Sequence, residues 1–337
     1  MKRKPQTMHN FKQHIETSET VAEESSSPPI LRADNISKTF GSVRALDRVT
    51  CSIAGASIFG LIGSNGAGKS TFLRLAAGVY RPSSGRMLFS DQPVYENPSA
   101  KQMIQFVADQ PFFHFENLKK MSALYRSLYL GWNQELYQEL MQIFPLQEDQ
   151  PFNQMSKGMR RQAAVMLAVA SKPRLLLLDE AFDGLDPVMR QNLKRILARQ
   201  VGEYGMTVLI ASQNLKELED FCDHVGLLHR GGLLFSEEID KLCLSIVKAQ
   251  IAFREPVPLE KLRDECLVIL QSRARGSIIE ILARNTEKEL RQTVEPHAPL
   301  LLDVLPLTLE ELFIYELGER AYKVHDIRSS EPGAHFM

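Results

Sequence analysis

The chain has 337 residues, a length that fits about two domains. Its 40 Lys and Arg residues balance 41 Asp and Glu residues, for a formal net charge of -1, and it therefore lacks the basic surplus that is usual in nucleic-acid binding proteins. Its four cysteines, Cys51, Cys222, Cys243 and Cys266, form no C-x-x-C pair, which is typical of a reducing compartment and argues against a zinc site.

The N-terminal residues 1–29 are polar and end in a Ser-Ser-Ser-Pro-Pro run, which predicts a disordered leader. No apolar core follows its basic residues, so a secretory signal is not expected. No run in the chain approaches the roughly 20 apolar residues that a membrane helix needs. We therefore expect a cytoplasmic chain that reaches any membrane only through a partner.

Two strand-like runs follow, ILRADNIS and VRALDRVTCSIA, separated by a turn at Gly41 and Ser42. They predict an antiparallel flap beside the main sheet. Phe40 lies near the end of the first run, and an aromatic ring there could stack on adenine. From the residue alone, a core position for Phe40 is the commoner alternative.

A glycine-rich loop comes next, after the short apolar run that ends before Gly63. Its spacing fits the phosphate-binding pattern G-x-x-x-x-G-K-[ST], in which backbone N–H groups surround an anion. Lys69 can reach the phosphates of a bound nucleotide, and the Ser70 hydroxyl can ligate Mg²⁺. The predicted ATP-binding residues of this loop are Gly63, Ser64, Asn65, Gly66, Ala67, Gly68, Lys69, Ser70 and Thr71.

Helical periodicity dominates residues 111–171, where Leu, Met and Tyr recur at three- and four-residue spacing. This stretch predicts a helical insertion in an otherwise α/β domain. Within it, Ser156 can cap a helix while its hydroxyl and the Gly158 N–H face outward toward an anion. Taken alone, this short motif is more typical of a simple helix cap.

A four-leucine run ends in Asp179 and Glu180, as expected for a parallel strand that is buried on both faces and ends at a ligand crevice. Asp179 is placed to hold Mg²⁺ and Glu180 to polarise a water molecule. Asp186 is an N-cap for a helix that begins at Pro187. A further buried strand precedes Gln213, and a hairpin turning at Gly231-Gly232 closes the domain at about residue 240.

Residues 241–322 show the order β-α-β-β-α-β-α, which predicts a small α+β accessory domain, with a ferredoxin-like arrangement as one option. A hairpin is expected to turn near residues 274–276, and Thr308 with Glu311 forms a capping box for a last helix. Residues 323–337 are expected to form a loose tail. A dimerisation or regulatory role is favoured over a second active site.

These pieces, in this order, resemble the ATP-binding subunits of ABC transporters over about Ile30 to Glu238. The run Met155-Ser156-Lys157-Gly158-Met159 is similar to the signature L-S-G-G-Q of that family. The resemblance implies a P-loop NTPase fold and a dimer that sandwiches two ATP molecules, each with Mg²⁺. It also implies that Ser156 and Gly158 meet the nucleotide of the partner subunit, that Phe40 stacks on adenine, and that Asp186 lies at the dimer interface.

Two positions depart from the family pattern. Where the family usually has a Gln before the helical insertion, this chain has Asp109 followed by Gln110; either residue could approach Mg²⁺ or the attacking water. The switch His of the family is replaced by Gln213. An amide can hydrogen-bond a phosphate, but it cannot change its protonation state as an imidazole can. We therefore expect slowed hydrolysis, with Glu180 and Gln213 as the catalytic residues.

The favoured function is an ATPase subunit that energises a membrane exporter through a separate permease, at the inner face of the cell membrane. Homodimers and heterodimers are both open, and no nucleic-acid partner is expected. One alternative is an ATP-gated regulatory or immunity subunit with negligible turnover. Another is a soluble ABC protein that is not linked to transport.

Overall fold

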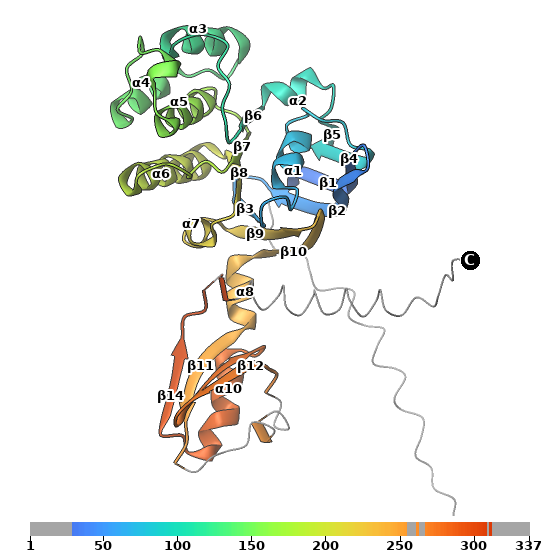
Figure 1. Cartoon of the computed structure of the whole chain (residues 1–337), viewed down its shortest axis with the longest axis vertical. Helices are drawn as coiled ribbons and strands as arrows, with labels where there is room; N and C mark the ends of the chain where they lie inside the picture. Colours follow the sequence, from blue (N-terminus) through green and yellow to red (C-terminus); the bar gives the residue numbers. More distant parts are fainter. Residues whose placement is uncertain (1–28, 255–260, 263–266, 309, 312–337) are drawn as a thin grey trace, which may run out of the picture.

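Two parts of the chain are built around sheets of their own in the computed structural model (Figure 1). The structure describes residues 29–254, 261–262, 267–308 and 310–311. The predicted tail and residues 1–28 of the predicted leader lie outside these ranges. Among the described residues, no helix is both long and apolar enough to cross a bilayer.

A six-stranded sheet forms the centre of the first part, in the order β10-β9-β3-β8-β7-β6. All neighbours run parallel except the hairpin of β9 and β10. The predicted four-leucine strand is β7, in which every residue is buried. The strands are β3 (Ile58–Ile62), β6 (Ile104–Val107), β7 (Leu175–Asp179), β8 (Thr207–Ser212), β9 (His224–His229) and β10 (Gly232–Glu238).

Each face of this sheet packs against a core of its own, because successive side chains of a strand point to opposite faces. Leu176 and Leu178 of β7 belong to the core that includes the helical insertion. Leu175 and Leu177 belong to the core that contains the flap and α1 (Lys69–Ala76). The phosphate loop therefore lies at the end of a sheet that is covered on both sides, as the continuous apolar run predicts.

The predicted antiparallel flap is present as a four-stranded sheet in the order β2-β1-β4-β5. Its first strand begins at Pro29, the last residue of the predicted leader and one residue before the predicted start of the domain. The strand that follows α1 joins the flap beside β1 rather than the central sheet. The strands are β1 (Pro29–Phe40), β2 (Val43–Ala54), β4 (Ser84–Phe89) and β5 (Gln92–Pro93).

The helices expected within residues 111–171 are also present, at the top of Figure 1. Polar side chains begin them: Asn117 caps α3, Asn133 caps α4 and Ser156 caps α5, each accepting a backbone N–H. The bounds are α3 (Leu118–Leu128), α4 (Gln134–Ile143), the 3₁₀ turn η1 (Phe152–Gln154) and α5 (Lys157–Ala170). The other helices are α2 (Pro98–Gln102), α6 (Pro187–Tyr204) and α7 (Leu215–Glu219).

The second part follows α8 (Ile239–Ser245) and contains a four-stranded antiparallel sheet in the order β12-β13-β11-β14. Strand β13 separates β11 from β12, and β11 separates β13 from β14, which is the split crossover order of a ferredoxin-like fold. Apolar residues of the sheet and of α10 form its core. The bounds are β11 (Val247–Ala252), β12 (Ile269–Arg275), β13 (Ile278–Ala283), α10 (Glu287–Val294), η2 (Glu295–His297) and β14 (Leu301–Leu305).

Two local features of the second part, a hairpin turn and a capping box, lie at or near the positions that the sequence predicts. The hairpin turns at residues 276–277, slightly later than predicted. The N–H of Glu311 donates to the Thr308 hydroxyl at 3.2 Å, and the N–H of Thr308 donates to the Glu311 carboxylate at 3.2 Å, as in a capping box. The helix expected from this cap lies outside the described residues beyond 311, as does most of the helix expected over 258–265.

Candidate nucleotide-binding site

The predicted phosphate loop connects β3 to α1. A Cβ atom added at Gly63 would lie 2.4 Å from the carbonyl oxygen of Leu228, so no side chain fits there. Gly66 has a φ of +78° and open space beside it. This left-handed backbone suits glycine, and it leaves room on the side of the loop where an anion would bind.

Lys69 opens α1 with its ammonium group held inside the loop. Its side chain is 6% exposed, and Nζ donates a hydrogen bond to the Gly63 carbonyl at 2.7 Å. Nζ also lies 3.5 Å from Oε1 of Glu180. This cation therefore faces the space that the loop surrounds, where it can neutralise phosphate charge.

Ser70 and Asp179 meet at the end of β7, where the Ser70 hydroxyl donates to Oδ1 of Asp179 at 3.1 Å. Burial raises the pKa of the Asp179 carboxyl above its ordinary value. A hydroxyl and one carboxylate suit Mg²⁺, which takes few protein ligands and completes its shell with water and phosphate oxygens. Among the described residues, no group of three or more His, Cys, Asp or Glu side chains could hold a metal by itself.

Glu180 sits at a sharp turn directly after β7, with a left-handed φ of +50°. Its N–H donates to the Ala211 carbonyl at 2.9 Å, and its carboxylate accepts the backbone N–H of Gln213 at 3.4 Å. Burial raises the pKa of Glu180 above its ordinary value. A strained turn that holds a partly desolvated carboxylate is typical of a catalytic base.

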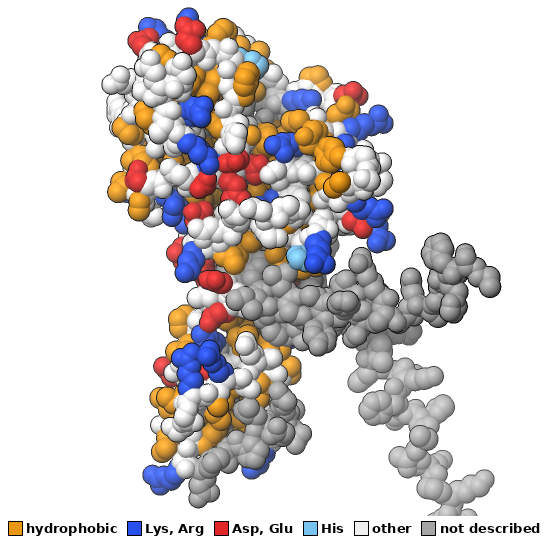
Figure 2. All heavy atoms as spheres, viewed as in Figure 1, with side chains coloured by type: hydrophobic (Ala, Val, Ile, Leu, Met, Phe, Trp, Pro, Cys, Tyr) orange, Lys and Arg blue, Asp and Glu red, His pale blue; other side chains and the backbone are white. Residues whose placement is uncertain are grey.

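The structure thus brings Lys69, Ser70, Asp179, Glu180 and Gln213 together at one edge of the central sheet. In Figure 2, acidic side chains gather in the middle of the first part, over the ends of β6 and β7. A partly buried carboxylate next to a lysine cation, beside a hydroxyl and a carboxylate that could hold Mg²⁺, can support hydrolysis of a phosphoanhydride.

Other predicted residues contact different elements. Ser156 accepts the Met159 N–H at 3.1 Å and caps α5, and Asp186 accepts the N–H groups of Val188 and Met189 at 3.0 Å and caps α6. A Cβ atom at Gly158 would lie 2.8 Å from the Gly184 carbonyl oxygen, so the start of α5 touches the loop before α6.

Phe40 lies on the surface rather than in the core. Its side chain is 44% exposed, and its ring meets Tyr80 edge-on at 5.3 Å between centroids. Lys38 places its Nζ 5.0 Å from the centre of the Phe40 ring. The sequence did not single out Tyr80, because nothing local connects it with a strand that ends forty residues earlier.

The segment after β6 contacts the start of α5. Oδ1 of Asp109 accepts a hydrogen bond from the Arg161 guanidinium and lies 3.8 Å from Nζ of Lys157. Arg161 also donates to the Asp109 carbonyl at 2.6 Å. Gln110 is exposed. Arg161 was missed from the sequence, where it reads as one of two adjacent arginines in a helix.

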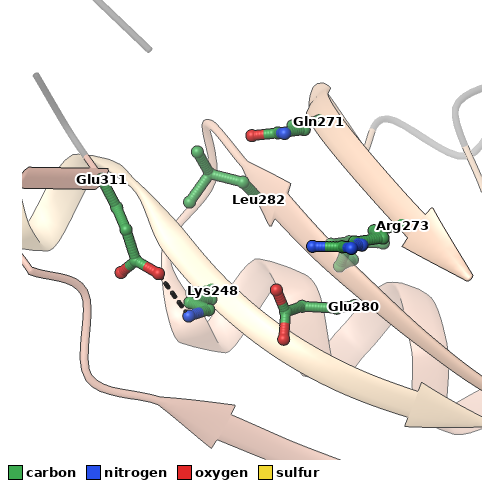
Figure 3. A pocket seen from close by; sticks show the side chains of 7 residues that line it. Lys248, Gln271, Arg273, Glu280, Leu282 and Glu311 are labelled. Atoms are coloured by element: carbon green, nitrogen blue, oxygen red, sulfur yellow. Dashed lines mark hydrogen bonds and ion pairs between the residues drawn. The ribbon is translucent and has the colours of Figure 1, made fainter. Parts of the chain in front are cut away.

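A separate hollow of about 230 Å³ lies on the sheet of the second part (Figure 3). Lys248 and Glu311 form an ion pair across it at 2.5 Å, and the Gln250 amide donates to Glu280 at 3.3 Å. Three of its four charged side chains, those of Lys248, Glu280 and Glu311, thus have polar partners. The nucleotide-site residues Lys69, Asp179 and Glu180 do not line it.

A parallel sheet, a glycine-rich loop that leads into a helix, and an acidic pair at the end of a neighbouring strand define a P-loop nucleotide-binding protein. The family model described as ABC transporter matches residues 46–183. ABC transporter ATP-binding protein YtrB of Bacillus subtilis is 30% identical over 284 residues, covering 84% of this chain and 96% of that protein. The chain therefore belongs to the ATP-binding proteins of ABC transporters.

Other matches agree with this family. Bacitracin transport ATP-binding protein BcrA of Bacillus licheniformis is 28% identical over 217 residues, covering 63% of this chain and 71% of that protein. The solved dimeric structure of the ATP-binding cassette MJ0796 bound to ADP and Pi has a TM-score of 0.57 at 20% identity, covering 62% of this chain and 98% of that one. At that identity, the structure supports the fold.

Proposed function

We propose that this chain hydrolyses ATP to energise a membrane exporter whose permease is a separate polypeptide. The observation that carries the proposal is the geometry around Glu180: a partly buried carboxylate that is held at a strained turn, 3.5 Å from the Lys69 ammonium. A chain that only binds nucleotide would not need a base in that position. The BcrA relative, a bacitracin transport protein by name, supports the export of a peptide-like compound.

In this proposal each residue has a defined task. Lys69 neutralises the terminal phosphates, and Ser70 with Asp179 would hold Mg²⁺. The bound magnesium ion supplies charge neutralisation at the phosphate oxygens that bear the developing charge. Glu180 orients the attacking water and takes up its proton, and its raised pKa favours this transfer near neutral pH.

The contact with a permease is supported by exposed aromatic side chains after β6. Phe112 is 79% exposed and Phe115 is 44% exposed, whereas Phe113 between them stacks on Phe152 at 3.7 Å between centroids. Large apolar side chains at the surface are typical of a partner interface. We infer that this segment docks on the permease and holds the chain at the inner face of the membrane.

Closure of two subunits is supported by the exposed start of α5, where Ser156 and Lys157 are at the surface. In a dimer of this family these residues would face the nucleotide of the partner subunit. Two partners fit this proposal, a second copy of this chain and a different ATP-binding chain. A partner with a histidine at the position of Gln213 would supply one fully equipped site.

Gln213 favours slow turnover. Its backbone N–H supports Glu180, but its amide side chain cannot accept and return a proton. The same residue keeps a second candidate function open, an ATP-gated regulatory or immunity subunit with negligible turnover. A soluble role without transport is the remaining alternative.

The test is steady-state ATP hydrolysis by the full chain, alone and with the membrane protein that co-purifies with it. Glu180→Gln should retain ATP binding, accumulate an ATP-bound dimer and lose turnover by about 10²–10⁴-fold, as for loss of a general base. If hydrolysis persists in that variant, Glu180 is not the base. Absence of any co-purifying membrane protein would favour the soluble alternative.

The switch position is tested in the same assay. Gln213→His should raise turnover several-fold while leaving ATP affinity within about twofold. An unchanged or lower rate would contradict the proposal that Gln213 slows hydrolysis. If the wild-type chain hydrolyses ATP no faster than background in the presence of the permease, the regulatory alternative is favoured.

A further inference from the structure

Four charged side chains from three segments meet beside the candidate site. Asp109 follows β6, Lys157 and Arg161 belong to the first turns of α5, and Asp183 lies in the loop between β7 and α6. We call them the Arg161 cluster. The first segment follows β6 and precedes the exposed Phe112. The second is α5, which begins in the signature motif and which we call the signature helix, and the third is the loop that leads from Glu180 to Asp186.

Arg161 is the centre of this cluster. Its side chain is only 1% exposed, and one guanidinium nitrogen, Nη2, donates to both the backbone carbonyl and the carboxylate of Asp109. The other, Nη1, donates to the backbone carbonyl of Asp183 and lies 3.6 Å from its carboxylate. A planar guanidinium presents its N–H donors in a fixed fork and so fixes the relative geometry of the two segments, whereas a lysine ammonium acts as a point charge without that fork.

Lys157 adds a second link between the same segments. Its Nζ donates to Oδ2 of Asp183 at 2.8 Å and lies 3.8 Å from Oδ1 of Asp109. The hydrogen bond from Lys157 lowers the pKa of the Asp183 carboxyl. Both acids are therefore shared between the same two cations.

The cluster coincides with positions where the chain departs from its family. Asp109 stands where a glutamine is usual, and Lys157 stands within the signature in place of a glycine. A buried cation is costly without a nearby anion, and the carboxylate of Asp109 supplies one to Arg161. The two departures, Asp109 and Lys157, thus carry opposite charges and lie next to each other.

We propose that Arg161 is a positioning residue that locks the segment after β6, the signature helix and the loop before α6 into one unit, and that Asp109 serves it as an anchor rather than as a magnesium ligand. Movement of the segment that carries Phe112 then moves the signature helix, and the loop containing Asp186 moves with it. This inference rests on the proposed function for its consequence in transport. Its geometry can be tested separately.

The first test separates an anchor from a magnesium ligand. In the full chain, binding of a fluorescent ATP analogue is titrated with Mg²⁺ for wild type and for Asp109→Asn. We expect the half-saturating Mg²⁺ concentration to stay within about twofold, because Asp109 does not hold the ion. A rise of tenfold or more would overturn the proposal.

The second test measures the lock itself by amide hydrogen exchange, which reports local opening. Arg161→Lys keeps the charge but loses the fork, and Asp109→Asn loses the anchor. Either variant should raise exchange about tenfold or more in residues 156–162 and 183–186, and the double variant should add little to the larger single effect. Additive effects, or unchanged exchange at 183–186, would refute a single unit.

A control is the Arg199–Glu139 pair, another ion pair between distant segments, in which the two guanidinium nitrogens contact the two carboxylate oxygens at 2.5 and 2.9 Å. Arg199→Lys should leave exchange at 156–162 and 183–186 unchanged. The same local opening in that variant would mean that any lost ion pair loosens the domain, and would remove the special role of Arg161.

The exchange and magnesium readouts do not depend on transport. If they come out as expected and the permease still fails to stimulate hydrolysis in wild type, the proposed function is wrong and the lock stands. If wild type is stimulated and Arg161→Lys loses about tenfold of that stimulation at unchanged ATP affinity, both stand. Full stimulation of Arg161→Lys would overturn the coupling role of the lock.

Discussion

The two parts of the chain differ in what they bury. The first part buries ionisable side chains, among them Lys69, Arg161, Asp179 and Glu217. In the second part, the buried side chains of the described residues are all apolar. Burial of a charge costs free energy unless a partner compensates, so a fold retains it where chemistry requires it. The contrast agrees with the proposal that the nucleotide site lies in the first part.

The largest expected effect comes from the buried cation of the first part. Lys69→Ala removes the ammonium that faces the phosphates, and we expect ATP affinity to fall about 10–100-fold, as for loss of a hydrogen bond to a charged group. Equilibrium binding of a fluorescent ATP analogue measures this effect. Lys172→Ala, at an exposed lysine that lies over the Tyr204 ring, is the control and should bind as wild type does. An equal loss of ATP affinity in Lys69→Ala and Lys172→Ala would contradict a special role for the buried lysine.

A smaller effect is expected from Asp179→Asn in the absence of nucleotide. Burial raises the pKa of Asp179 in the folded state, so the folded protein holds this proton more tightly than the unfolded chain. Stability from this group is therefore present below its unfolded pKa and lost as the pH rises through the folded pKa. The variant should melt at a higher temperature than wild type at pH 7.5, with the gain shrinking toward pH 4.

Thermal unfolding followed by circular dichroism at several pH values checks this prediction. Wild type should gain thermal stability from Mg²⁺ and ATP, and the variant should gain less, because it lacks the carboxylate that we propose as a magnesium ligand. A variant that is less stable at pH 7.5 would indicate that the Ser70 hydrogen bond outweighs the cost of burying the carboxylate.

The smallest effect is expected in the second part. Lys248→Gln breaks the ion pair between Lys248 and Glu311. The Lys248 side chain is 18% exposed and the Glu311 side chain is 37% exposed. Partly exposed pairs contribute about 0–1 kcal/mol, so chemical denaturation should show a loss within that range, and ATP affinity should not change. A changed ATP affinity would show that the hollow in Figure 3 communicates with the nucleotide site.

Much of the site could be predicted because its signals are local. The phosphate loop, the strand that ends at Asp179 and the caps at Ser156 and Asp186 each depend on residues close together in the chain. The buried cation of Arg161 could not be predicted in this way, since its partner Asp109 is 52 residues away. The packing of Tyr80 on Phe40 was missed for the same reason.

The same distinction between local and long-range signals applies to prediction of the fold. Periodicity predicts the helices of residues 111–171 and the buried strands, because each reflects the environment of its own face. It does not say which sheet a short strand joins, and β4 pairs with β1 in the flap although it follows α1 in the chain. The hydrogen-bonding partners of an edge strand depend on tertiary packing rather than on its own composition.

The contact between Gly158 and the Gly184 carbonyl also limits how this protein can vary. With 2.8 Å between that oxygen and a Cβ atom at position 158, even an alanine displaces the loop that ends in Asp186. A substitution at Gly158 would thus require a compensating change in the loop that contains Gly184. Substitutions at the exposed Ser156 or Lys157 meet no such close backbone contact, but they remove the cap of α5 or the hydrogen bond to Asp183.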